Sequence, residues 1–187
     1  KEKTRKKTIN KWFETQDQIA YYQSFSKEKV IWKRIGSSLR FSYSNEEIFC
    51  LDSTCIATGE KIKYLTALLN SKLCNYLLFE NAPRTGMGDL IISVQALEPL
   101  KVYYPTNGEQ NLIENLVTKI IKTKQKNPEE NTSKLENVID LMVYKLYTLT
   151  YAECQIVDPN IGQLISREEY DRATLEELAE RKSSLKR

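Results

Sequence analysis

Lysine, arginine and aromatic side chains alternate through the first quarter of this 187-residue chain. Residues 1–43 carry 11 Lys or Arg against four Asp or Glu, residues 44–105 carry five against seven, and residues 106–187 carry 12 against 14. The overall charge of +3 therefore conceals a basic first quarter of +7. Cations bind phosphates and flat rings stack on bases, so this composition is typical of a surface that faces a polyanion. A solvated basic face over an aromatic core would have the same composition.

The chain has no histidine, which excludes most hydrolytic mechanisms. Without imidazole there is no Ser-His or Cys-His nucleophile and no histidine metal ligand. The four cysteines form no Cys-x-x-Cys pair, so a zinc site would need four thiolates to converge from across the chain. We expect reduced thiols, no metal site and no catalytic residue. The cysteines are Cys50, Cys55, Cys74 and Cys154.

Nucleotide-binding and nucleophile-elbow glycine motifs are absent from the sequence. Gly86 and Gly88 fall in a short polar loop, where they let the backbone come close to another backbone or to a phosphate. Asp171, Glu180 and Lys182 mimic a nuclease carboxylate pattern, but they fall in a polar terminal segment with no strand to present them. An enzymatic reading of the chain therefore has little support.

No apolar run approaches the roughly 20 residues that cross a bilayer, and no hydrophobic signal segment follows the basic start. We expect a soluble cytoplasmic protein. The first residue is Lys rather than Met, which suggests a piece of a longer protein.

Short runs of branched and aromatic residues in the first half predict β-strands separated by polar turns. Four of these strands are expected to form a meander, and two more precede Pro105. The predicted strands cover residues 30–35, 39–43, 48–51 and 54–57, then residues 90–94 and 97–103.

Apolar residues at intervals of three and four predict helices over residues 61–79, 109–126 and 133–149. The last two should form an antiparallel hairpin, because only a short polar connection with Asn127-Pro128 separates them. A Ser or Thr followed three residues later by Glu marks three helix starts: Ser133 with Glu136, Thr150 with Glu153, and Ser166 with Glu169.

The expected fold class is α+β: an irregular, mostly antiparallel β part with a packed helix, followed by a C-terminal helical hairpin. The expected organisation is a linker remnant (1–11), an α+β domain (12–105), a helical hairpin that serves as a spacer (106–157) and a C-terminal helical tail (158–187).

Five phrases occur in a fixed order along the chain. They are Trp12-Phe13-Glu14-x-Gln16-Asp17 running into Tyr21-Tyr22, Phe25-x-Lys27-x-Lys29-Val30-Ile31-Trp32, Phe49-Cys50-Leu51-Asp52-Ser53-Thr54, Tyr64-Leu65-x-Ala67-Leu68-Leu69-Asn70-Ser71-Lys72-Leu73, and Ile139-Asp140-x-x-Val143-Tyr144-x-Leu146-Tyr147-x-Leu149-Thr150. Together, from about Trp12 to about Val157, they resemble the TaqI-like C-terminal specificity domain of bacterial restriction-modification proteins. This domain is the target-recognition region of type IIG enzymes and related adenine methyltransferases.

The resemblance implies a module that selects a sequence in double-stranded DNA so that a separate methyltransferase or nuclease domain of the parent chain can act on it. The Asn-Pro-Pro-Tyr-type motif of the methyltransferase domain does not occur here. S-adenosylmethionine and Mg²⁺ are therefore expected only in the catalytic domains, and no cofactor is expected in this chain. By the same resemblance, the helical hairpin would set the distance and angle between the DNA-recognition domain and the methyltransferase domain.

Base-reading residues should be polar, sit at loops or strand ends, and have no better structural role. The candidates are Arg34, Ser37, Ser38 and Arg40 around Gly36, and Arg84 and Gln95 beside the glycine loop. Phosphate contacts suit flexible point charges and close-approaching backbone. The candidates for those contacts are Lys27, Lys29, Lys33, Lys72, Thr85, Gly86 and Gly88.

Two alternatives from other classes remain at this stage. One is a protein-interaction module whose basic face binds an acidic partner. The other is a metal-dependent enzyme built without histidine, which would need an acidic pocket that holds a divalent cation.

Overall fold

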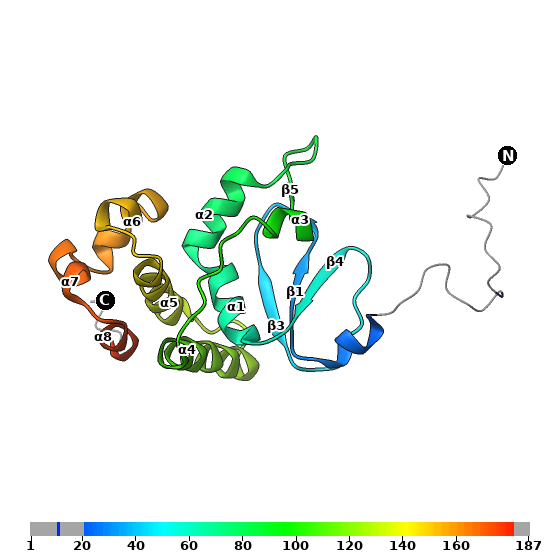
Figure 1. Cartoon of the computed structure of the whole chain (residues 1–187), viewed down its shortest axis with the longest axis horizontal. Helices are drawn as coiled ribbons and strands as arrows, with labels where there is room; N and C mark the ends of the chain where they lie inside the picture. The colour runs from blue at the N-terminus through cyan, green and yellow to red at the C-terminus, as the bar shows by residue number, and fades with distance from the viewer. Residues whose placement is uncertain (1–10, 12–20, 182–187) are drawn as a thin grey trace.

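The structure is a computed structural model that describes residue 11 and residues 21–181. A three-stranded antiparallel sheet with packed helices is followed by a helical C-terminal part, so the predicted α+β class is confirmed. In Figure 1 the sheet lies on the right, α4–α8 lie on the left, and α1 and α2 separate them. None of the helices within the described residues is long and apolar enough to cross a membrane.

The sheet is built around β1 (Lys29–Lys33), which follows the short 3-10 helix η1 (Tyr22–Ser26). It pairs on one side with β3 (Phe41–Ser44) and on the other with β4 (Thr54–Thr58), giving the strand order β3-β1-β4. The predicted meander is therefore wrong, because β4 returns to the far side of β1. The predicted strand over residues 48–51 is also wrong: this segment is the connection between β3 and β4.

A second, two-stranded sheet joins segments that are far apart in the sequence. Its strands are β2 (Ile35–Gly36) and β5 (Leu90–Ile91), in the antiparallel register Ile35↔Ile91 and Gly36↔Leu90. The short helix α3 (Val94–Leu97) follows β5, so the predicted strand over 90–94 is only two residues long.

The predicted strand over residues 97–103 is absent as well. Its first residue, Leu97, ends α3, and tyrosine hydroxyl groups bind the backbone between Pro99 and Pro105 in place of a neighbouring strand. The Tyr103 N–H donates to the Tyr147 hydroxyl (2.9 Å), and the Tyr64 hydroxyl donates to the Tyr103 carbonyl (3.0 Å). Branched and aromatic residues therefore did not indicate sheet pairing in this segment.

The long helix predicted over residues 61–79 is two helices, α1 (Ile62–Asn70) and α2 (Lys72–Asn81). They are separated by Ser71, whose backbone is extended and whose hydroxyl accepts a hydrogen bond from the Cys74 N–H. Ser71 therefore ends one helix and caps the next. The break changes the direction in which the α2 side chains face.

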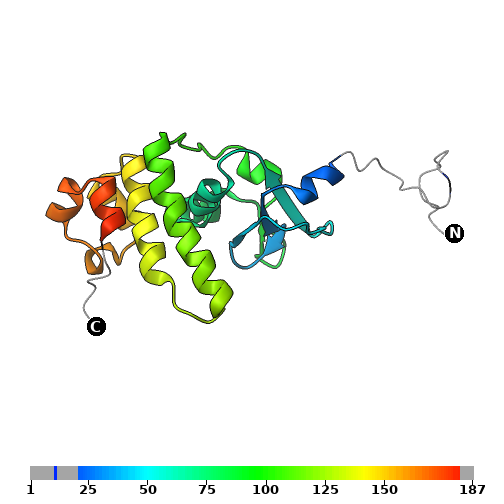
Figure 2. The same cartoon turned by 90° about the horizontal axis from the view of Figure 1, so that it is seen from below.

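The predicted hairpin is formed by α4 (Asn107–Lys126) and α5 (Ser133–Leu146), which lie side by side in Figure 2. The α5 start differs from the expectation: the N-cap is Thr132, its hydroxyl donates to Glu136 (2.6 Å), and no Ser133 capping box forms. A capping box that was not predicted, Thr106 with Glu109, begins α4.

Four short helical elements follow: α6 (Tyr151–Val157), the 3-10 turn η2 (Ile161–Gln163), α7 (Arg167–Arg172) and α8 (Leu175–Glu180). The predicted capping boxes of Thr150 with Glu153 and Ser166 with Glu169 are both present. Buried residues of this region, such as Tyr170 and Leu178, belong to the same apolar cluster as α4 and α5. The region after residue 157 is therefore packed against the hairpin.

Two apolar clusters form the core of the molecule, and α1 contributes to both. Ile62 and Leu69 pack with the sheet residues Val30 and Trp32, whereas Tyr64, Ala67 and Leu68 pack with α4 and α5. Domain boundaries after residues 105 and 157 stay a prediction.

Candidate nucleic-acid interface

The segment from Arg34 to Arg40, which we call the Gly36 turn, leaves the sheet on a well-anchored base. The Trp32 indole N–H donates to the Ile92 carbonyl (2.8 Å), and the Arg34 N–H and C=O bond to Ser53 and Ile92. At the other end, the Asn70 side chain accepts from the Phe41 N–H (3.1 Å) and donates to its carbonyl (2.7 Å). Fixed ends of this kind hold a loop in one position while its side chains stay available.

The four predicted base-contact side chains of this turn all face solvent. Arg34, Ser37, Ser38 and Arg40 are exposed, and Gly36 is half-buried because it pairs with Leu90. The chain is thus free to present two guanidinium groups and two hydroxyl groups from one short segment.

The second predicted segment, the glycine loop of residues 83–89, is closed by its own hydrogen bonds. The Thr85 N–H donates to Asp89, the Gly88 N–H donates to Thr85, and the Thr85 hydroxyl accepts from Met87 and Asp89. Gly88 has a φ of +91°, which favours glycine at this position. The Thr85 oxygens and the Gly88 N–H therefore stabilise the loop itself.

Arg84 has a structural role that the sequence did not indicate. Its guanidinium donates to the carbonyls of Phe79 (3.0 Å) and Gly88 (3.2 Å) and lies 4.4 Å from the centre of the Phe79 ring. It therefore ties the glycine loop to the end of α2, and it no longer meets the requirement that a base-reading residue have no better role. Gln95 lies exposed on α3.

The pairing of β2 with β5 brings the two predicted segments together. Gly36 lies opposite Leu90, which directly follows the glycine loop and also forms a bridge with Arg84. The two segments are about 50 residues apart in the sequence, and no local pattern marked this contact.

An open cleft of about 360 Å³ lies beside the Gly36 turn. Ser37, Ser38 and Leu39 line one wall, and the α2 residues Tyr76 and Phe79 line another. Both rings are exposed and stand one helical turn apart. The apolar spacing that predicted one helix over residues 61–79 would put Tyr76 on its buried face, because the break at residue 71 that turns α2 was not predicted.

Two of the predicted phosphate-contact lysines are engaged within the protein. Lys29, in the central strand, is fully buried and its ammonium donates to the Glu46 carbonyl (2.6 Å). Lys72 forms an ion pair with Asp158 (2.7 Å) and lies 3.8 Å from Asp140. The prediction of free phosphate-binding cations at these two positions is therefore corrected.

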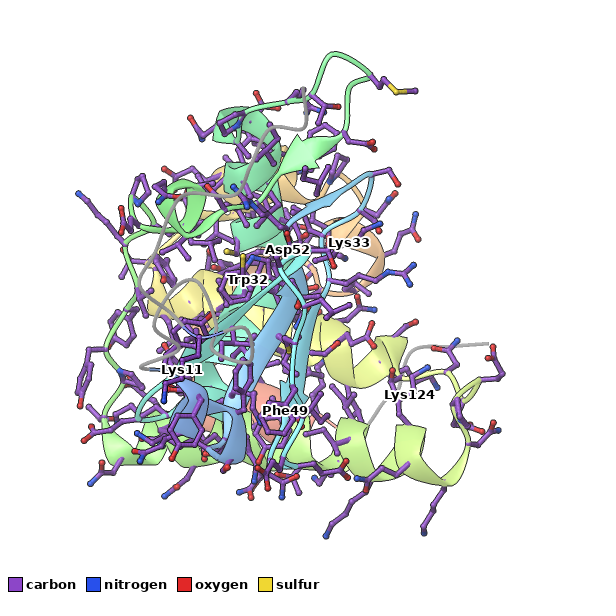
Figure 3. The ribbon with its side chains drawn as sticks, turned by 90° about the vertical axis from the view of Figure 1, so that its right-hand side faces the viewer. Lys11, Trp32, Lys33, Phe49, Asp52 and Lys124 are labelled. Carbon is purple, nitrogen blue, oxygen red and sulfur yellow. The ribbon has the colours of Figure 1, made fainter. Side chains whose placement is uncertain are left out.

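The other two lysines, Lys27 and Lys33, are exposed. Figure 3 shows Lys33 toward the right-hand side, whereas Trp32, the residue before it, lies in the middle of the molecule. This contrast follows from the alternation of side chains along β1.

The ion cluster of Lys72 connects α2 to α5 and to the end of α6. Asp140 accepts a hydrogen bond from the Lys72 backbone N–H (2.8 Å), and Asp158 pairs with the Lys72 ammonium. Burial raises the pKa of the Asp140 carboxyl to about 7, although the Lys72 N–H and ammonium oppose this shift. The cluster joins the hairpin to the sheet-bearing half of the chain.

Groups suited to metal binding do not gather within residues 11 and 21–181. No three potential His, Cys, Asp or Glu ligands come together there, and the four cysteines are free thiols. Asp171 lies on α7, where it forms an exposed ion pair with Arg167 (3.8 Å), and Glu180 ends α8. Lys182 lies outside the described residues.

An α+β domain that presents arginines and serines from a fixed, exposed turn has the features of a nucleic-acid recognition module. Residues 1–100 match the TaqI-like C-terminal specificity domain, and the chain belongs to this family. Membership implies a DNA target-recognition role in restriction-modification enzymes. The match ends before α4, so the hairpin and the later helices lie beyond it. No curated protein matches the chain.

Proposed function

We propose that this chain reads a specific sequence in double-stranded DNA and positions separate methyltransferase or nuclease domains of its parent enzyme. The observation that carries the proposal is the pairing of β2 with β5, which joins the Gly36 turn to the glycine loop in the region of the chain that matches a specificity family. Sequence readers need several polar groups on one fixed surface, and this pairing supplies such a surface.

Arg34 and Arg40 are the preferred base-reading residues. Both side chains are exposed, and both flank a turn that hydrogen bonds hold at each end. Arginine presents a planar fork that fits the O6 and N7 acceptors of guanine in the major groove. Ser37 and Ser38, between them, would add shorter-range donors and acceptors, while Lys27 and Lys33 would bind phosphates.

The chain would select DNA without modifying it. In this proposal S-adenosylmethionine and Mg²⁺ belong to the catalytic domains, and the hairpin α4–α5 sets their distance and angle relative to the reader. The Lys72 ion cluster supports that role, because it fixes α5 and α6 to α2.

Selection from randomised duplexes tests this function. The 187-residue chain should enrich one short motif, and purified chain given S-adenosylmethionine or Mg²⁺ should neither methylate nor cleave that motif. Enrichment of no motif would refute sequence recognition, and robust methylation by the purified chain would refute the non-catalytic role. A variant with both Arg34→Ala and Arg40→Ala serves as the control and should enrich the motif poorly.

A further inference from the structure

A row of polar side chains runs along the outer face of α4. At 3.6 residues per turn, these positions fall within a sector of about 80° around the helix axis. All of them are exposed, whereas the buried residues of α4 face the opposite way. The row, which we call the α4 basic row, consists of Asn111, Asn115, Lys119, Lys122 and Lys126.

Acidic side chains are excluded from this row. The two acidic residues of α4 are Glu109 and Glu114. Both lie in the first half of the helix and outside the 80° sector of the row. Among the described residues, no carboxylate forms an ion pair with Lys119, Lys122 or Lys126. The row therefore carries three uncompensated positive charges, although residues 106–187 as a whole are net acidic.

The C-terminal half of α4, which carries the three lysines of the row, extends away from the core of the molecule. Figure 3 labels Lys33, which precedes the Gly36 turn, and Lys124, which lies near the end of α4 on the face opposite the row. Figure 2 shows this end of the hairpin projecting beyond the body of the helical region.

We propose that the α4 basic row is a second DNA-contacting surface, which binds the phosphate backbone of duplex DNA. This inference rests on the proposed function and extends it to a helix beyond the family match. Lysine ammonium and asparagine amide groups both donate to phosphate oxygens. The seven residue steps from Lys119 to Lys126 rise about 10.5 Å, or about three base-pair steps of 3.4 Å, so the lysines could reach successive phosphates of one strand.

Phosphate contacts position a protein on DNA and carry no sequence information. The α4 basic row should therefore strengthen binding to every duplex equally, while the Gly36 turn supplies the preference. An acidic protein is the other partner that such a row would attract, and binding to DNA distinguishes the two.

The test measures the affinity of the 187-residue chain for a random 30-base-pair duplex and for a selected duplex, at salt concentrations between about 25 and 200 mM. Each phosphate contact adds about 0.9 to the magnitude of the slope of log affinity against log salt concentration. We expect Lys122→Gln to lower the slope by about 0.9, and the triple variant Lys119→Gln, Lys122→Gln, Lys126→Gln to lower it by about 2 to 3. Glutamine keeps a good helix propensity, so α4 should remain folded.

Lys124→Gln is the matched control. Lys124 lies on the same helix but on the opposite face, where its ammonium donates to the Pro128 carbonyl (3.0 Å). Its replacement should leave the slope unchanged, and every variant should keep the wild-type ratio of selected to random affinity and the wild-type melting temperature.

An unchanged slope in the triple variant, or an equal loss with Lys124→Gln, would overturn the inference while leaving the proposed function intact. If the wild-type chain binds duplex without sequence preference and the triple variant still has a lower salt slope, the proposed function is refuted and the inference about the α4 basic row stands. A chain that binds no duplex at any of these salt concentrations would refute both.

Discussion

At the residue scale, we expect the exposed arginines of the first quarter to contact bases and the exposed lysines to contact phosphates. Replacing Arg34 or Arg40 by Ala should cost about 1–3 kcal/mol on the selected sequence and relax the preference at one base position. Replacing Lys27 by Ala should weaken all sequences alike and lower the salt slope by about one. The measurement is the ratio of selected to random affinity at one fixed salt concentration.

An unchanged ratio for both arginine variants would move base reading away from the Gly36 turn. Gln95 and the cleft residues Tyr76 and Phe79 would then be the next candidates. Lys29→Met provides a useful control, because the buried Lys29 ammonium cannot reach a phosphate and its loss should not change the salt slope.

The raised pKa of Asp140 predicts how stability depends on pH. The pKa is about 7 in the folded chain against 3.8 for a free side chain, so the folded state binds more protons between these values. Stability should therefore fall as pH rises from about 4 to about 7, by at most about 1.4 kcal/mol per pH unit, and this contribution should level off above that range. Urea unfolding at several pH values measures the slope.

Asp140→Asn should remove that slope while keeping an acceptor for the Lys72 N–H. Asp171→Asn, which removes an exposed carboxylate on α7, should leave the slope in place. The charged neighbours Lys72, Asp158 and Glu136 act on Asp140, so a slope that survives in Asp140→Asn would assign the proton to another member of this group.

At the scale of the elements, Asn70 links the end of α1 to the start of β3. Its side chain makes two hydrogen bonds to the Phe41 backbone and one to the Thr66 carbonyl (2.9 Å). We expect Asn70→Ala to cost about 1–3 kcal/mol in the free energy of unfolding, because it leaves backbone groups unpaired, and to weaken sequence preference by loosening the Gly36 turn.

Asn81→Ala is the matched control, since the exposed Asn81 side chain makes one hydrogen bond within α2, to Leu77. It should change the free energy of unfolding by about 0.5 kcal/mol or less and leave binding unchanged. Equal effects of the two substitutions in urea unfolding would argue against a special role for Asn70.

Elements that depend on local sequence were predicted well. Two of the three predicted capping boxes are present, because this motif involves residues only three positions apart. At residues 132–136 the helix began one residue earlier than expected, so Thr132 took the capping position from Ser133. The Ser71 break was missed because the apolar spacing continues through it, although a serine in that position is a good N-cap.

The pairing of strands, and which side chains are exposed, could not be predicted from local sequence. The contact between Gly36 and Leu90 joins distant segments, and it depends on how β1, β4 and α2 pack. The same packing buried Lys29 and paired Lys72, which look like ordinary surface lysines in the sequence. Arg34 and Arg40 are exposed because they flank a local turn, and exposure of this kind can be predicted from turn residues such as Gly36.

At the scale of the whole molecule, α1 connects the sheet region to the helical region. Its two faces contribute to different apolar clusters, with Ile62 and Leu69 on the sheet side and Tyr64 and Leu68 on the helical side. Unfolding either region alone would expose one face of α1 to water, at a cost of about 25 cal/mol for each Å² of apolar surface. We therefore expect a single unfolding transition in spite of the predicted domain boundary at residue 105.

The two regions can be followed separately during urea unfolding. Far-UV circular dichroism mainly reports the helices α4–α8, and fluorescence of Trp32 reports the sheet cluster once the second tryptophan is removed with Trp12→Phe. Coincident midpoints and slopes would support a single cooperative unit, because two probes of a two-state transition must agree. Two separated transitions would instead show that the sheet region folds independently of the helical region. In Leu68→Ala we expect both curves to give a free energy of unfolding that is lower by about 2–5 kcal/mol, because α1 couples the two regions.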